Sequence, residues 1–123
     1  MSKLLLIVTA LVELGAGVAL LVAPSWLVSL LLGDGLTSPQ SLVLARIMSA
    51  ALISIGVACW FASKGESRDH RALVSGVLLY NLAVPAILIR AALTLGLRGF
   101  ALWPASVLHV GLAIWCIFCL RRR

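Results

Sequence analysis

Apolar residues occur along this chain in four long runs that short polar breaks separate. The runs extend over about residues 4–23, 41–63, 72–95 and 101–120. Each run is long enough to cross a lipid bilayer as a helix, which takes ~20 mostly apolar residues. Membrane-spanning strands would instead alternate polar and apolar residues. The pattern therefore predicts an all-α protein, a single membrane domain over residues 1–123 built as a bundle of four transmembrane helices.

Turn-forming residues mark the ends of these runs. Pro24 ends the first run, and a shorter apolar piece over residues 26–32 follows it. That piece is too short to span a bilayer, so it either lies along the interface or extends the first helix past a proline kink. The length of the first run and its Glu13 favour a retained helix over a cleaved signal peptide. Pro85 predicts a kink in the third span.

Composition agrees with this assignment. Hydrophobic residues make up 63% of the chain and charged residues 11%, whereas a soluble domain is about half apolar and about a quarter charged. Lipid is therefore the expected solvent for most of the surface. The net charge of +6 comes from basic residues at the ends of the apolar runs rather than on one polar face. This distribution argues against nucleic acid as a partner and favours anionic lipids.

The basic residues also predict an orientation. One side receives Lys3, the charged loop over residues 64–71 and the tail Arg121, Arg122 and Arg123, while the loop over residues 33–40 has no Lys or Arg. The positive-inside rule then places both termini in the cytoplasm, as expected for a multi-pass protein of the bacterial inner membrane. The three terminal arginines are expected to contact lipid headgroups, and His70 in the charged loop is expected to be solvated.

Polar side chains inside the predicted spans are the candidates for function, because a charge in the bilayer is costly unless it is paired or hydrated. Glu13 and His109 fall near the middle of the membrane, and Tyr80 and Asn81 lie at about the same depth. Arg46 lies in the outer quarter, at an axial offset from Glu13 of roughly 7 Å by the helical rise. These five residues are the candidates for handling a ligand or a proton.

Small residues share a helix face with three of these groups, which predicts that each faces a neighbouring helix. Tyr80 also has small companions, whereas Asn81 has bulkier ones and Arg90 is expected to extend outward to the headgroups. The stripes are Thr9, Glu13 and Gly17; Arg46, Ala50, Ser54 and Ala58; and Ala101, Ala105, His109, Ala113 and Cys116.

In the simplest arrangement, Glu13 forms an ion pair with Arg46. His109, together with Tyr80 or Asn81, then completes the hydrogen bonds of this pair. Three interpretations stay open. The network fixes only the packing of the helices, or it handles a proton or a ligand, or the groups make no contact with one another.

Three cysteines, Cys59, Cys116 and Cys119, fall near the cytoplasmic ends of the second and fourth spans. Apolar packing is the simplest role for them. A soft-metal site of three thiolates and S-acylation near the interface are the alternatives. No catalytic motif is present in the sequence, so it predicts neither a catalytic residue nor a cofactor.

The segment over residues 13–17, the breaks at Pro24 and Gly33 and the four helices resemble small bacterial membrane proteins of the DoxX-like type. This resemblance implies a four-helix membrane bundle and, as in a few relatives, association with quinone-linked or thiol redox systems. It transfers no active-site residue to this chain.

The length, the four helices and Glu13 in the first helix also resemble the small multidrug resistance transporters, whose essential glutamate lies in helix one. Arg46, Arg90 and His109 depart from that pattern.

The sequence thus favours a small non-enzymatic membrane protein, either an accessory or assembly subunit of a membrane complex or a homo-oligomer. The alternative is a proton-coupled small-molecule transporter, or a lipid- or quinone-binding protein, that uses a mid-membrane Glu/His/Arg cluster.

Overall fold

A computed structural model describes residues 1–65 and 70–122 of this chain. The regular secondary structure of these residues is entirely helical: α1 (Ser2–Val22), α2 (Pro24–Leu32), α3 (Pro39–Lys64), α4 (His70–Leu95) and α5 (Leu102–Arg121). All but α2 are long and apolar enough to cross a membrane. The predicted all-α class with four candidate spans is confirmed. The observed helices begin and end within a few residues of the predicted runs, and α4 continues through Pro85.

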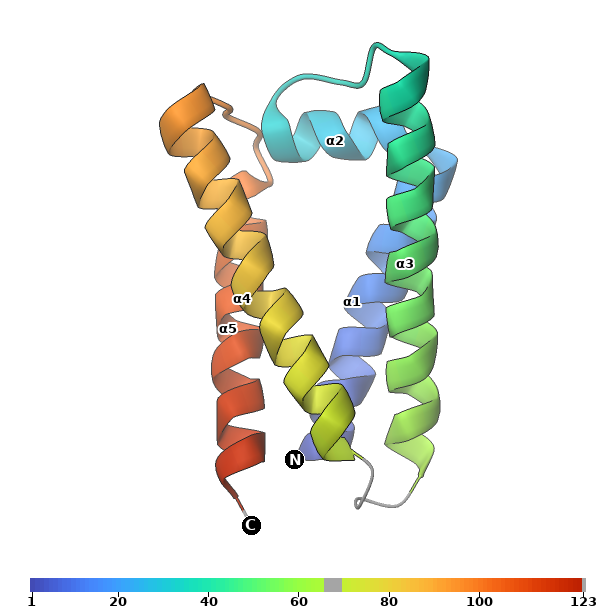
Figure 1. The fold of residues 1–123 in the computed structure, drawn as a ribbon, viewed down its shortest axis with the longest axis vertical. Helices are drawn as coiled ribbons and strands as arrows, with labels where there is room; N and C mark the ends of the chain where they lie inside the picture. Colours follow the sequence, from blue (N-terminus) through green and yellow to red (C-terminus); the bar gives the residue numbers. More distant parts are fainter. Residues whose placement is uncertain (66–69, 123) are drawn as a thin grey trace.

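The long helices form two tight pairs, α1 with α3 and α4 with α5, and the contacts between the pairs are far fewer. Figure 1 shows the pairs side by side, with both chain ends at the same end of the bundle. The first pair is not a simple hairpin, because α2 and a loop lie between α1 and α3. Each pair is therefore a packing unit, and the junction between the pairs is a separate feature.

Two glycines bring α1 and α3 together. A Cβ atom added at Gly17 would lie 2.7 Å from the Ile53 side chain, and one added at Gly56 would lie 2.7 Å from the Leu14 side chain. Real Cβ atoms do not approach neighbours so closely. The two backbones can pack at this distance because each helix presents a glycine to the other, the usual device for close helix contact in lipid.

The two pairs join near the chain termini. Leu5, Leu6 and Ala10 of α1 pack there against residues of the three other long helices, and the cluster as a whole is Leu5, Leu6, Ala10, Cys59, Val74, Val77, Leu112 and Cys116. This terminal core closes one half of the bundle. Many large apolar side chains elsewhere on the long helices are exposed, as expected for surfaces that face lipid.

The short helix α2 lies across the opposite end of the bundle rather than continuing α1 (Figure 1). It starts at Pro24, which cannot donate the backbone hydrogen bond that would extend α1. The backbone N–H of Ala101 donates to the Leu30 carbonyl at 2.7 Å, and Gly99 packs against the Leu31 backbone with no room for a side chain. These contacts attach α2 to the loop that leads into α5.

Candidate functional site

The polar cluster lies one helical turn beyond the terminal core, where the two pairs meet. Glu13 follows Ala10 on α1, Asn81 follows Val77 on α4, and His109 precedes Leu112 on α5. The exposed fractions of the side chains are 1% for Glu13, 0% for Asn81 and 8% for His109. Three helices thus contribute buried polar side chains at the same level of the bundle.

Asn81 and His109 form the best-defined contact of this cluster, with 2.7 Å between Asn81 Oδ1 and His109 Nδ1. The Asn81 amide nitrogen donates to the Val77 carbonyl at 2.8 Å, which fixes the orientation of the amide group. Since Oδ1 can only accept, His109 Nδ1 carries the hydrogen and donates it. The second ring nitrogen, Nε2, is then the one that can accept a proton.

Tyr80 connects this histidine to the acidic group. The Tyr80 ring meets the His109 imidazole edge-on, with 5.5 Å between the ring centroids. The Tyr80 hydroxyl interacts with the Glu13 carboxyl group across the junction between the pairs. Side chains of α1, α4 and α5 are thus neighbours at this level of the bundle.

Two polar atoms on α1 lack a partner within this arrangement. Glu13 Oε1 and Thr9 Oγ1 are buried and make no hydrogen bond, and they lie one turn apart on the same face of the helix. A buried polar atom without a partner costs free energy. Thr9 lies four residues before Glu13, so the helical spacing of the sequence already places it on the same face.

The structure brings Glu13, Tyr80, Asn81 and His109 together but leaves Arg46 out. Arg46 is exposed on α3 and forms no pair with Glu13, so the expected ion pair is wrong. The whole stripe Arg46, Ala50, Ser54 and Ala58 faces away from the chain's own helices. The physical reason is that α3 contacts α1 through Ser49 and Gly56 instead.

The remaining polar residues have different environments. Asn81 is buried completely although its helix companions are bulkier, whereas Tyr80 is half-buried. His70 is not solvated: it is 3% exposed at the start of α4. Arg90 is exposed, in agreement with an outward-facing side chain.

The cysteines are free thiols, with Cys59 and Cys116 buried in the terminal core and Cys119 half-buried. Within the described residues, no group of three or more His, Cys, Asp or Glu side chains could hold a metal ion. Arg121 and Arg122 are exposed where α5 ends, and Arg123 lies outside the described residues.

Comparison with known proteins adds no relative. No protein-family model, curated protein or solved structure matches this chain. The resemblances to DoxX-like proteins and to small multidrug resistance transporters therefore stay predictions from the sequence.

Proposed function

We propose that this chain is a non-enzymatic, multi-pass membrane protein that binds a proton and a small amphipathic molecule between its two helix pairs. The observation that supports this proposal most is the unpartnered Glu13 carboxyl oxygen, buried at the junction of the pairs. A proton, a cation or a ligand hydroxyl would supply the missing partner. An intramembrane acidic group that faces a helix junction is typical of proton and substrate paths.

The surroundings of Glu13 favour an exchangeable partner over a permanent one. Arg46, the counter-ion that the sequence predicts for Glu13, is exposed on α3. Tyr80 and His109 are in contact beside Glu13, and their hydroxyl group and imidazole can both exchange protons. The limited contact between the helix pairs supports entry of a ligand by separation of the pairs, since Glu13 itself is closed off.

The distribution of the basic residues supports an orientation of the protein in the membrane. Lys3, Lys64, Arg71, Arg121 and Arg122 lie at the end of the bundle that carries both termini, and the positive-inside rule would place that end in the cytoplasm of a bacterial inner membrane. The DoxX-like resemblance supports a quinone as one ligand class. The transporter resemblance supports an organic cation as another.

Substitution of Glu13 by Gln tests the proposal, because the amide keeps the shape of the side chain and removes its acid. Purified protein would be reconstituted in liposomes with a pH gradient and offered tetraphenylphosphonium as the cation or a short-chain ubiquinone as the neutral ligand. Wild-type protein is expected to bind or move one of these probes with proton exchange. Glu13→Gln is expected to lose that activity at least tenfold while it stays folded.

A purely structural cluster gives the opposite pattern. In that case Glu13→Gln would reduce the yield of folded protein, and neither probe would distinguish the remaining protein from the wild type. The matched control is Asp34→Asn, which removes an exposed acid at the other end of the bundle.

A second candidate function, a subunit of a homo-oligomer or of a larger membrane complex, rests on a different surface. The stripe Arg46, Ala50, Ser54 and Ala58 is exposed on α3, and small residues on an outward helix face suit close contact with another helix. Light scattering in mild detergent tests this role. A stable monomer that co-purifies with no partner would contradict it.

A further inference from the structure

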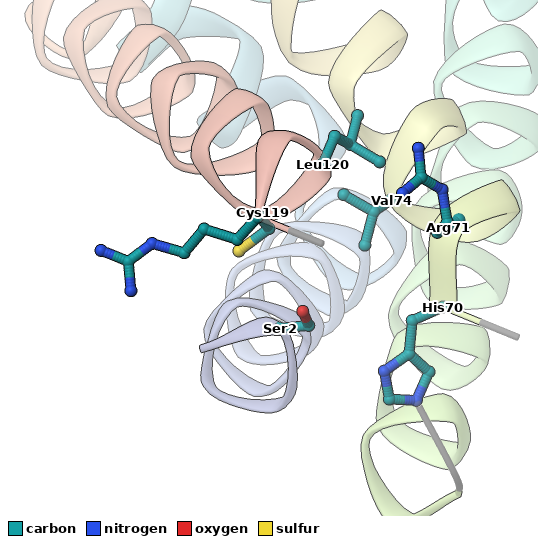
Figure 2. A pocket seen from close by; sticks show the side chains of 7 residues that line it. Ser2, His70, Arg71, Val74, Cys119 and Leu120 are labelled. Carbon is teal, nitrogen blue, oxygen red and sulfur yellow. The ribbon is translucent and has the colours of Figure 1, made fainter. Parts of the chain in front are cut away.

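A hollow of about 240 Å³ opens among α1, α4 and α5 at the end of the bundle that carries both termini. Its polar lining comes from Ser2 of α1, His70 and Arg71 of α4, and Arg122 just after α5, and Val74 and Cys119 form part of its apolar wall. Figure 2 shows the labelled Ser2, His70 and Cys119 side chains on three different helices around this hollow. The hollow is separate from the Glu13 cluster and has a different chemistry.

Positive charge dominates its lining. Two arginines line the hollow, Arg71 of α4 and Arg122 just after α5, and no acidic side chain of the described residues lines it. Figure 2 shows the Arg71 guanidinium turned away from the His70 ring, so this long side chain would turn to reach a bound anion. The amino ends of α1 and α4 lie at Ser2 and His70. The first N–H groups of a helix have no partner within the helix and carry partial positive charge. Side chains and backbone alike therefore favour an anion here.

His70 adds an unpartnered group to the same lining. Its Nε2 lies 2.6 Å from the Ala62 carbonyl oxygen; since a carbonyl only accepts, Nε2 carries a hydrogen and donates it. Its Nδ1 is buried and has no hydrogen-bond partner. The bond to Ala62 orients the ring, and the second nitrogen is left for an occupant of the hollow. A protonated Nδ1 would donate to an anionic oxygen.

We propose that this hollow binds a phosphate group, held by Arg71 and Arg122, with His70 in its protonated form donating from Nδ1 as a third partner. Several donors from separate parts of the chain match the several acceptor oxygens of a phosphate better than they match a single carboxylate. The phosphate could belong to a phospholipid headgroup or to a soluble phosphate ester, because the hollow lies where the predicted spans end. Arg121, the neighbour of Arg122, does not line the hollow, so the site differs from general attraction of the basic tail to a membrane.

Native mass spectrometry of the full-length protein in mild detergent tests this site, with phosphatidylglycerol and phosphatidylcholine as probes. Wild-type protein is expected to retain phosphatidylglycerol preferentially. Arg71→Gln and Arg122→Gln are each expected to weaken its binding by about tenfold, the usual loss for one hydrogen bond to a charged group. Arg121→Gln is the matched control and is expected to change binding by less than about twofold.

His70→Gln sharpens the test, because the amide nitrogen can still donate to Ala62 while the group at Nδ1 is lost. It is expected to weaken binding with little change in the thermal unfolding temperature. Equal losses in Arg121→Gln and Arg122→Gln, or equal binding of the two lipids, would overturn the proposal.

Inorganic phosphate distinguishes the two sources. If millimolar phosphate displaces phosphatidylglycerol and raises the unfolding temperature of the wild type but not of Arg122→Gln, a soluble phosphate ester is the ligand. If only the lipid binds, with the same dependence on Arg71 and Arg122, the ligand is a headgroup. Either result supports the site, and binding of neither probe overturns it.

Discussion

The contact between α1 and α3 and the junction between the two helix pairs are built in different ways. At the first, Gly17 and Gly56 let two backbones approach until no Cβ atom would fit. At the second, contacts are few, and the side chains that meet there include Glu13, Tyr80 and His109. The first surface gains van der Waals contact along its length, whereas the second places polar groups in an apolar interior.

This difference has a functional meaning. Close glycine packing gives α1 and α3 dense van der Waals contact, so this pair is expected to behave as one rigid unit. The junction holds buried polar atoms without partners, and a small separation of the pairs would admit a ligand to them. Stability and chemistry thus lie on different surfaces of the same bundle.

The largest effect is expected from Gly17→Leu. The new side chain would overlap Ile53 and the Ser49 carbonyl, so the free energy of unfolding should fall by about 3 kcal/mol. Thermal or denaturant unfolding in mild detergent measures it. Gly15→Leu is the matched control, since a Cβ at Gly15 meets nothing within 4 Å. Similar losses in both variants would show that α1 and α3 are not held by this contact.

An intermediate effect is expected from Asn81→Leu at the junction. The change removes the acceptor of the His109 Nδ1–H and leaves that buried donor unpaired, which should cost about 1 to 2 kcal/mol in a membrane protein. Ser75→Ala is the control, because its exposed hydroxyl bonds only to the Arg71 carbonyl of its own helix. The NMR resonance of the His109 imidazole should shift in Asn81→Leu alone.

The smallest effect is expected from Arg46→Gln. Because the side chain is exposed and makes no pair with Glu13, the free energy of unfolding should change by less than about 0.5 kcal/mol. Removal of one partner of a buried ion pair would instead cost about 3 to 5 kcal/mol. The unfolding measurement therefore decides between the observed arrangement and the pair expected from the sequence. Arg90→Gln, an exposed arginine on α4, is the reference.

The sequence by itself determined where the helices lie along the chain and how many of them can span a membrane. In lipid every backbone N–H and C=O group must be hydrogen-bonded within the protein, so a long apolar run has few structures open to it other than a helix. Pro24, Gly33 and Pro39 then fix where helices end and begin, as the capping of α3 by Ser38 also shows. The depth of Glu13 and His109 follows from the same counting along a regular helix.

Only the tertiary structure decided which face of each helix turns inward. The stripes of Glu13 and of Arg46 both carry small residues, but only the first is buried, at a junction of three helices. Between apolar helices in lipid there is no hydrophobic effect to select the inward face, so a small-residue stripe fits a contact within the chain as well as one with another molecule. His70 was misjudged for a similar reason, since its burial depends on α3, whose Ala62 carbonyl accepts its Nε2–H.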